Sequence, residues 1–70
     1  MNSELLKSYI GKNRDTQEAL AGAIGVSLSA LNAKINGHSS FRQNEIDVIR
    51  RRYSLTASEL EAIFFSSESV

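Results

Sequence analysis

The sequence predicts an all-α domain built from five short helices, and three observations support this fold class. The 70 residues include no proline and only four glycines, so few positions would interrupt a helix. No stretch shows the sustained alternation of β-branched and polar residues that is typical of a half-buried strand. Apolar residues instead recur at the spacing of one helical face, between segments that can cap helices.

Two helices are predicted near the N-terminus. The first spans about residues 3–12 and can be capped by Asn2 or Ser3. Its apolar side is formed by Leu5, Leu6, Tyr9 and Ile10. The second helix begins after Thr16, a good N-cap, and ends before Gly25, which can supply the left-handed backbone that stops a helix. Its inner stripe is formed by Leu20, Ala21 and Ile24.

The third and fourth helices are predicted in the middle of the chain. The third begins after Ser27, again a residue type that caps helices, and ends at Asn36 and Gly37. Its apolar line is formed by Leu28, Leu31 and Ile35. The fourth spans about residues 43–52. Its apolar face is formed by Ile46, Ile49 and Tyr53, with Val48 beside them.

The fifth helix has the clearest start in the sequence. Thr56 and Glu59 have the spacing of a capping box, and Leu55 and Leu60 have that of the flanking hydrophobic staple. The helix is expected to continue through Ile63 to position 64 or 65. The predicted organisation is therefore one domain over residues 1–65, followed by a flexible polar tail over residues 66–70.

Composition limits the classes of protein that fit. With 41% apolar residues the chain can bury a modest core, and the lack of cysteine excludes disulfides and thiolate metal sites. No apolar run approaches the roughly 20 residues that span a bilayer, and the N-terminus lacks the features of a signal peptide. We therefore expect a cytoplasmic protein with no membrane partner.

The net charge is zero, but the charges are unevenly distributed along the chain. Residues 1–52 hold all eight Lys and Arg and five acidic residues, which gives a net charge of +3. Residues 53–70 hold three acidic residues and no basic ones, a net charge of −3. This asymmetry is consistent with one end of the molecule approaching a polyanion while the other faces elsewhere. Ordinary solvated surface charges that happen to divide this way are the other interpretation.

The second and third helices are joined so closely that they must touch near the corner. A tight corner of this kind needs a small residue in the first helix and a turn residue that tolerates positive φ. Ala21 and Gly25 meet these two requirements. Apolar residues on both sides of the turn would fix the angle between the helices: Leu20, Ile24, Val26 and Leu31.

The stretch "TQEALAGAIGVSLSALNAKING", residues 16–37, resembles the helix-turn-helix of the Cro/CI-type phage repressor family, also called lambda-repressor-like. It shows the family's Thr-Gln start, the Ala, the Gly-Val-Ser turn and the Asn-Gly end. The resemblance of the five-helix outline covers about residues 3–65, and the later part is similar to the small Cro-like regulators. The resemblance implies a transcriptional regulator that binds double-stranded DNA operators as a homodimer.

The resemblance places the third helix in the major groove, where four residues would read bases: Leu28, Ser29, Asn32 and Ala33. The Asn32 amide can pair bidentately with adenine, and the other interpretation is a solvated asparagine on the helix surface. The Ser29 hydroxyl discriminates little between bases. Leu28 either touches a thymine methyl group or extends the core line, and the sequence favours neither. Ala33 is small and permits close approach to the groove.

Six residues are expected to contact the DNA backbone: Gln17, Ser27, Lys34, Asn36, Ser39 and Arg42. Gln17 matches a family position that holds phosphate at the start of the second helix, where backbone amides favour an anion. For Arg42, an exposed loop charge is an equally good interpretation. The three arginines at residues 50–52 diverge by about 100° along a helix, so they are not expected to form one patch.

The C-terminal end is the predicted dimer interface, because "AIFF" contains two phenylalanines that are consecutive in the sequence. Phe64 and Phe65 point about 100° apart on a helix, so one ring should be left for a partner. The other interpretation is that both rings fold back on the first and fourth helices.

No catalytic set, phosphate-binding glycine loop or metal-ligand cluster is recognisable, and His38 stands alone. We therefore expect no enzymatic activity, no cofactor, no metal and no small-molecule substrate. The alternative function is a protein-interaction module of the same fold, such as an antirepressor or an antitoxin-like partner.

Overall fold

Residues 1–65 are described by a computed structural model, and within this range the chain forms five α-helices and no strand. The helices are α1 (Ser3–Lys12), α2 (Gln17–Ile24), α3 (Leu28–Ile35), α4 (Gln43–Tyr53) and α5 (Ala57–Phe64). The all-α class and the five predicted helices are confirmed, with boundaries within about one residue of those expected. The predicted polar tail lies outside the described residues.

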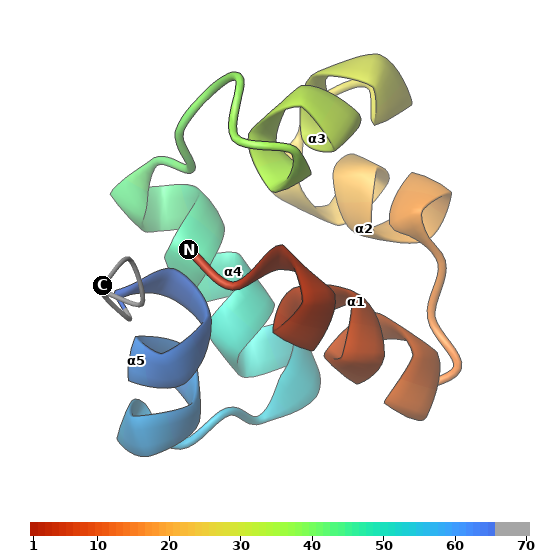
Figure 1. The fold of residues 1–70 in the computed structure, drawn as a ribbon. Helices are drawn as coiled ribbons and strands as arrows, with labels where there is room; N and C mark the ends of the chain where they lie inside the picture. Colours follow the sequence, from red (N-terminus) through yellow and green to blue (C-terminus); the bar gives the residue numbers. More distant parts are fainter. Residues whose placement is uncertain (66–70) are drawn as a thin grey trace.

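The helices form two groups around α4 (Figure 1). At one end of the molecule α2 and α3 pack against each other, and α2 also contacts α4. At the other end α1 packs against α5. The start of α1 and the end of α5 are tied by a hydrogen bond from the Asn2 N–H to the Ile63 carbonyl, at 2.7 Å. This tie closes the fold, because it joins the first and last helices.

One apolar core joins all five helices. The fully buried side chains that make its centre are Leu6, Leu20, Leu31, Ile49 and Ile63, one from each helix. Ala21 is 2% exposed, so the prediction that this small residue is buried at the α2–α3 corner is confirmed. Each helix therefore fixes its orientation by burying one stripe, and the opposite stripe of each is available for contacts with solvent or partners.

The helix starts follow the predicted caps. Four side chains accept the backbone N–H three residues further on, at 3.0 to 3.1 Å: Asn2, Thr16, Ser27 and Thr56. The Glu59 carboxylate also accepts the Thr56 N–H at 2.8 Å, which completes the capping box. These bonds satisfy amides that would otherwise lack a partner, so local sequence defines where the helices begin.

The ends of the first four helices share one turn, in which the chain passes through a left-handed residue just beyond the helix. After α2 and α3 that residue is glycine: Gly25 at φ 80° and Gly37 at φ 85°. After α1 and α4 it is Arg14 at φ 55° and Ser54 at φ 52°, which the sequence did not reveal. In all four turns the following residue donates its N–H five residues back, at 2.9 Å, as Val26 does to Ala21.

Candidate nucleic-acid interface

The unit formed by α2, a three-residue turn and α3 presents the residues that the sequence singled out. Gly25 allows the reversal, and the Ser27 hydroxyl then starts α3 by accepting the Ala30 N–H at 3.1 Å. Leu31 and Ile35 are 0% and 3% exposed, so they hold one side of α3 in the core. The other side of α3 has a fixed direction because the helix cannot rotate without withdrawing these two residues.

The outward side of α3 carries three of the four predicted base-reading residues. Leu28, Ser29 and Asn32 are exposed, and Ala33 is half-buried. Leu28 is 42% exposed, so it does not extend the core line, and of the two interpretations of this residue only the outward one remains. The face offers a carboxamide, a hydroxyl and an apolar tip, a chemistry suited to base edges and methyl groups.

Lys34 lies inside the protein, and this position corrects the expectation that it contacts phosphate. The residue is 9% exposed, and its Nζ lies 3.1 Å from Glu45 Oε1 of α4. The ammonium also donates to the Ser40 carbonyl, at 3.1 Å. Its long stem turns toward α4 from the last turn of α3, so the cation is used to join α3, α4 and the connecting loop.

Glu45, the partner of Lys34, was not recognised from the sequence. Burial raises the pKa of its carboxyl. Two contacts lower this pKa: a hydrogen bond from the Arg42 N–H, at 2.9 Å, and the Lys34 ammonium. The net pKa lies below the ordinary value. The carboxylate is therefore charged at neutral pH although it is buried. The only local signal was a glutamate in the first turn of α4, where the carboxylate also satisfies a helix N–H.

The other predicted phosphate contacts lie at or near the surface. Gln17 is the first residue of α2 and is half-buried, whereas the remaining four are exposed: Ser27, Asn36, Ser39 and Arg42. Ser39 and Arg42 line a groove of about 630 Å³ between α3 and the start of α4, with Ala30 and Ala33 on its other side. The structure thus brings Ser39 and Arg42 to one groove beside α3.

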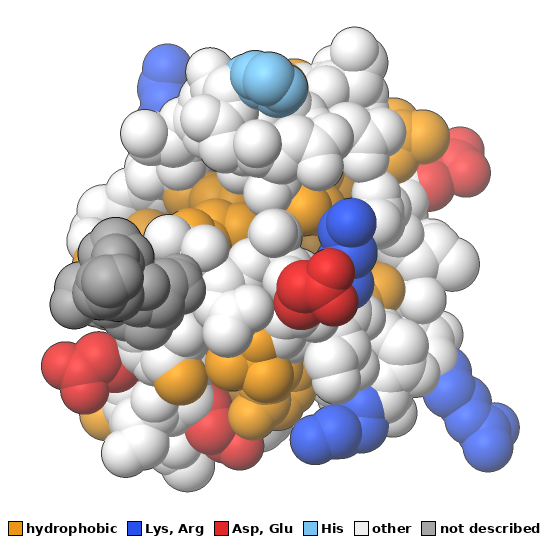
Figure 2. All heavy atoms as spheres, in the orientation of Figure 1, with side chains coloured by type: hydrophobic (Ala, Val, Ile, Leu, Met, Phe, Trp, Pro, Cys, Tyr) orange, Lys and Arg blue, Asp and Glu red, His pale blue; other side chains and the backbone are white. Residues whose placement is uncertain are grey.

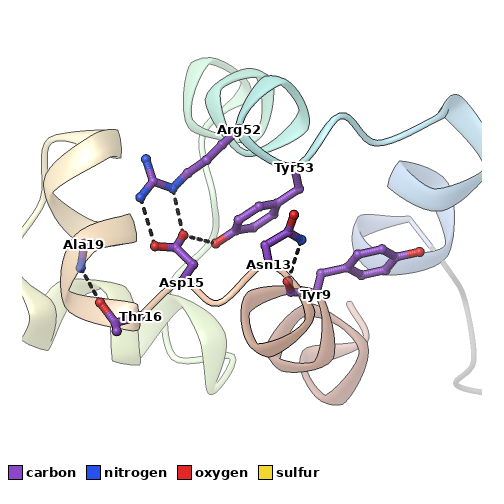
Figure 3. Close-up of polar contacts among 7 residues, drawn as sticks. All are labelled: Tyr9, Asn13, Asp15, Thr16, Ala19, Arg52 and Tyr53. Atoms are coloured by element: carbon purple, nitrogen blue, oxygen red, sulfur yellow. Dashed lines mark hydrogen bonds and ion pairs between the residues drawn. The ribbon is translucent and has the colours of Figure 1, made fainter.

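A polar cluster that the sequence did not predict fixes the linker before α2 to the end of α4 (Figure 3). The Asp15 carboxylate accepts two hydrogen bonds from the Arg52 guanidinium, at 2.7 and 2.9 Å, and one from the Tyr53 hydroxyl, at 2.6 Å. The Arg52 guanidinium is thereby paired with Asp15, and it points away from its neighbours Arg50 and Arg51 along the helix. No local pattern joins residues 37 positions apart, so only the fold reveals the cluster.

Hydrogen bonds, charges and burial within this cluster shift three pKa values, and the bond to Asp15 raises the pKa of the Arg52 guanidinium. The hydrogen bonds from Arg52, followed in strength by the Tyr53 and Thr16 donors, hold the pKa of Asp15 well below its usual range despite opposing desolvation. Burial and the nearby Asp15 carboxylate raise the pKa of the Tyr53 hydroxyl. Both groups therefore stay in the states that their hydrogen bond requires at neutral pH.

The two C-terminal aromatic rings have different environments, as their helical spacing predicted. Phe64 is half-buried and packs edge-to-face on Phe41, with ring centroids 5.4 Å apart. Phe65 is 57% exposed. Both rings border a cleft of about 440 Å³ that Ile35 and Ile46 also line. Figure 2 shows apolar side chains gathered in a depression below the α3 end of the molecule.

Residues 1–65 contain no group of three or more His, Cys or acidic side chains placed to hold a metal ion. No helix in that range is long and apolar enough to cross a membrane. In comparisons with known proteins, no family model, curated protein or solved structure matches the chain.

Proposed function

We propose that the protein is a sequence-specific DNA-binding transcriptional regulator of the Cro-like, lambda-repressor-like kind, with α2 and α3 as its helix-turn-helix. The observation that carries this proposal is the outward face of α3. Leu28, Ser29 and Asn32 are exposed on a helix whose opposite side is locked into the core. A rigid helix with short polar groups on its free side is what major-groove readout requires.

In this proposal α3 lies in the major groove, which is about 12 Å wide and admits one helix. Asn32 pairs with an adenine, accepting from N6 and donating to N7, while Ser29 adds a less selective hydrogen bond. The exposed Leu28 side chain contacts a thymine methyl group, and Ala33 lets the helix approach closely. Base preference therefore depends mainly on one carboxamide and one apolar contact.

Five residues hold the DNA backbone in the proposed complex: Gln17, Ser27, Asn36, Ser39 and Arg42. Lys34 is not among them, because its ammonium is buried against Glu45. Backbone contacts set the position of the protein on the duplex, and base contacts then select the sequence. The bound protein blocks or repositions polymerase sterically and needs neither a cofactor nor a catalytic step.

The protein acts as a dimer on a palindromic operator, because one short helix reads too few base pairs to be selective. Phe65, exposed at the end of α5, is the proposed contact between protomers. The half-sites then lie about 34 Å apart on one face of the DNA. The dimer forms mainly on DNA if this single aromatic contact dominates it.

Selection of bound duplexes from a random pool tests the proposal. The wild-type protein should enrich a palindrome, and Asn32→Ala should lose roughly 1–3 kcal/mol of binding free energy and relax one or two base pairs. Asn36→Ala is the matched control, since loss of a backbone contact weakens all sequences alike. No enrichment, with no DNA retained at moderate salt, would instead favour the protein-interaction module.

Phe65→Ala tests the dimer on full and half operators taken from that selection. Lost cooperativity on the full site with unchanged affinity for the half-site supports the interface. Equal losses of affinity on the full and half sites would mean that the Phe65 ring stabilises the fold of each protomer and does not form the dimer contact. Phe64→Ala is the comparison. The Phe64 ring is half-buried and packs on Phe41, so its loss should lower the stability of the fold and not only the cooperativity of binding.

A further inference from the structure

Arg14 occupies a backbone conformation that an arginine adopts only at a cost. It lies at φ 55°, in the left-handed turn that follows α1. The turn is held by hydrogen bonds from its own N–H to the Gly11 carbonyl, at 3.0 Å, and from Asp15 N–H to the Ile10 carbonyl, at 2.9 Å. Glycine takes this conformation without a steric penalty, and the matching turns after α2 and α3 use Gly25 and Gly37.

The charged neighbours of Arg14 are already engaged, whereas Arg14 is not. The Lys12 ammonium lies over the Tyr9 ring, 4.7 Å from its centroid. Asp15 is bound to Arg52 and Tyr53. Arg14 is exposed and, within residues 1–65, its side chain forms neither an ion pair nor a hydrogen bond. Because Asp15 is neutralised by Arg52, the charge of Arg14 is not cancelled by its neighbour.

The position of Arg14 is set by the same cluster that neutralises Asp15. In Figure 3 the Asp15 side chain points toward Arg52 and Tyr53, and Thr16 next to it begins α2. Arg14 is thus held two residues before the cap of α2 and three before Gln17. In Figure 1 the linker between α1 and α2 and the starts of α2 and α3 follow one side of the molecule.

We propose that Arg14 binds a phosphate of the DNA backbone at the edge of the site that α3 reads, and that this contact is what its strained backbone serves. This inference rests on the proposed function. A guanidinium binds phosphate through two parallel N–H bonds, which suits a contact at the rim of an interface. α3 itself supplies no free cation, because its only basic residue, Lys34, is buried against Glu45.

Three substitutions separate the role of the charge from that of the backbone. Arg14→Ala removes the charge and keeps Cβ, Arg14→Gly removes both, and Ser54→Gly relieves the same strain after α4 without changing charge. The thermal midpoint of Arg14→Gly should exceed that of Arg14→Ala. Ser54→Gly should likewise melt above the wild type. If Arg14→Gly is no more stable than Arg14→Ala, the strain that motivates the assignment is absent and the proposal is overturned.

Binding is measured on a short duplex of random sequence, because phosphate contacts do not depend on base sequence. Arg14→Ala and Arg14→Gly should each bind about 5- to 10-fold more weakly than the wild type at low salt. Their affinity deficit should shrink about 3-fold between 50 and 200 mM salt, because one lost phosphate contact reduces the salt slope by about 0.9. Ser54→Gly should keep the wild-type dependence of affinity on salt, because it changes no charge. A further variant, Arg14→Lys, should keep it as well, because lysine retains the positive charge.

The outcomes distinguish this inference from the function on which it rests. A wild-type protein that binds the duplex, with Arg14→Gly and Ser54→Gly binding equally well at every salt concentration, overturns the role of Arg14 alone. A wild-type protein that does not bind the duplex at any salt concentration overturns the proposed function and this inference together. If Ser54→Gly loses more affinity for the duplex than Arg14→Gly does, the turns affect binding by changing the fold. That result also overturns the phosphate contact.

Discussion

Replacing Lys34 with methionine tests whether this residue belongs to the interior or to the DNA interface. Methionine keeps the unbranched apolar stem of the side chain but removes the ammonium, so Glu45 is left buried without its ionic partner. Both side chains are under 10% exposed, at 9% and 6%, and the pair is closed at 3.1 Å. Breaking a buried pair of this kind costs about 3–5 kcal/mol.

The expected loss is large for a domain of this size. Small domains are stable by only about 5–15 kcal/mol, so Lys34→Met should lower the thermal midpoint by 10 °C or more, at about 4–8 °C per kcal/mol. Lys34→Met combined with Glu45→Gln should recover part of the loss, because the amide still accepts the Arg42 N–H without a buried charge. Urea unfolding of the two single variants, the double variant and the wild type measures this coupling.

The pH dependence adds a second measure of the same pair. The pKa of Glu45 is lowered in the folded protein, so its contribution to stability is present at neutral pH and is lost as the pH falls below about 4. The stability difference between wild type and Lys34→Met should therefore narrow from pH 7 to pH 3. A fully stable Lys34→Met protein with a reduced salt slope on DNA would refute the reasoning and restore Lys34 as a phosphate contact.

Three further predictions concern the corner, the linker and a helix end. Ala21→Leu should cost about 1–3 kcal/mol and weaken DNA binding in parallel, because Ala21 is 2% exposed; unchanged melting would argue against a tight corner. Asp15→Asn should lower stability by about 1–2 kcal/mol at pH 7 and by much less at pH 2. The sign follows from the lowered pKa of Asp15, whose stabilising charge is lost in acid; a pH-independent difference in urea unfolding would contradict it. Ser54→Gly should raise the free energy of unfolding by about 0.5–1 kcal/mol. This figure is the steric cost of the left-handed conformation minus the entropy that a glycine adds to the unfolded chain. A lower melting midpoint would show that Ser54 is not strained.

The positions of the helices were predictable because their signals are local. Caps act over three residues, as Thr56 and Glu59 show, and apolar stripes repeat within two turns. The burial of Ala21 followed from the same kind of reasoning, since a three-residue turn leaves little room between two helices. The divergence of Phe64 and Phe65 also followed from helical geometry alone.

The roles of charged residues were harder to predict, because a charge finds its partner through space. Lys34 looked like a surface cation at the end of α3, but its long side chain reaches a carboxylate on α4. Arg52 was expected to diverge from Arg50 and Arg51, but no local pattern indicates that it binds a carboxylate 37 positions away. A lysine or arginine stem spans several ångströms, so its sequence neighbours do not define where the charge lies.

By itself, the sequence determined the all-α class, the order and limits of the helices and the small residue at the α2–α3 corner. These features depend on hydrogen bonds and periodicities within a few residues. Only the tertiary structure decided which polar groups remain outside: Asn32 and Arg14 are exposed, whereas Lys34 and Asp15 are held by partners from α4. The physical reason is that burial of a charge requires a paired group, and the fold alone brings that group within hydrogen-bonding distance.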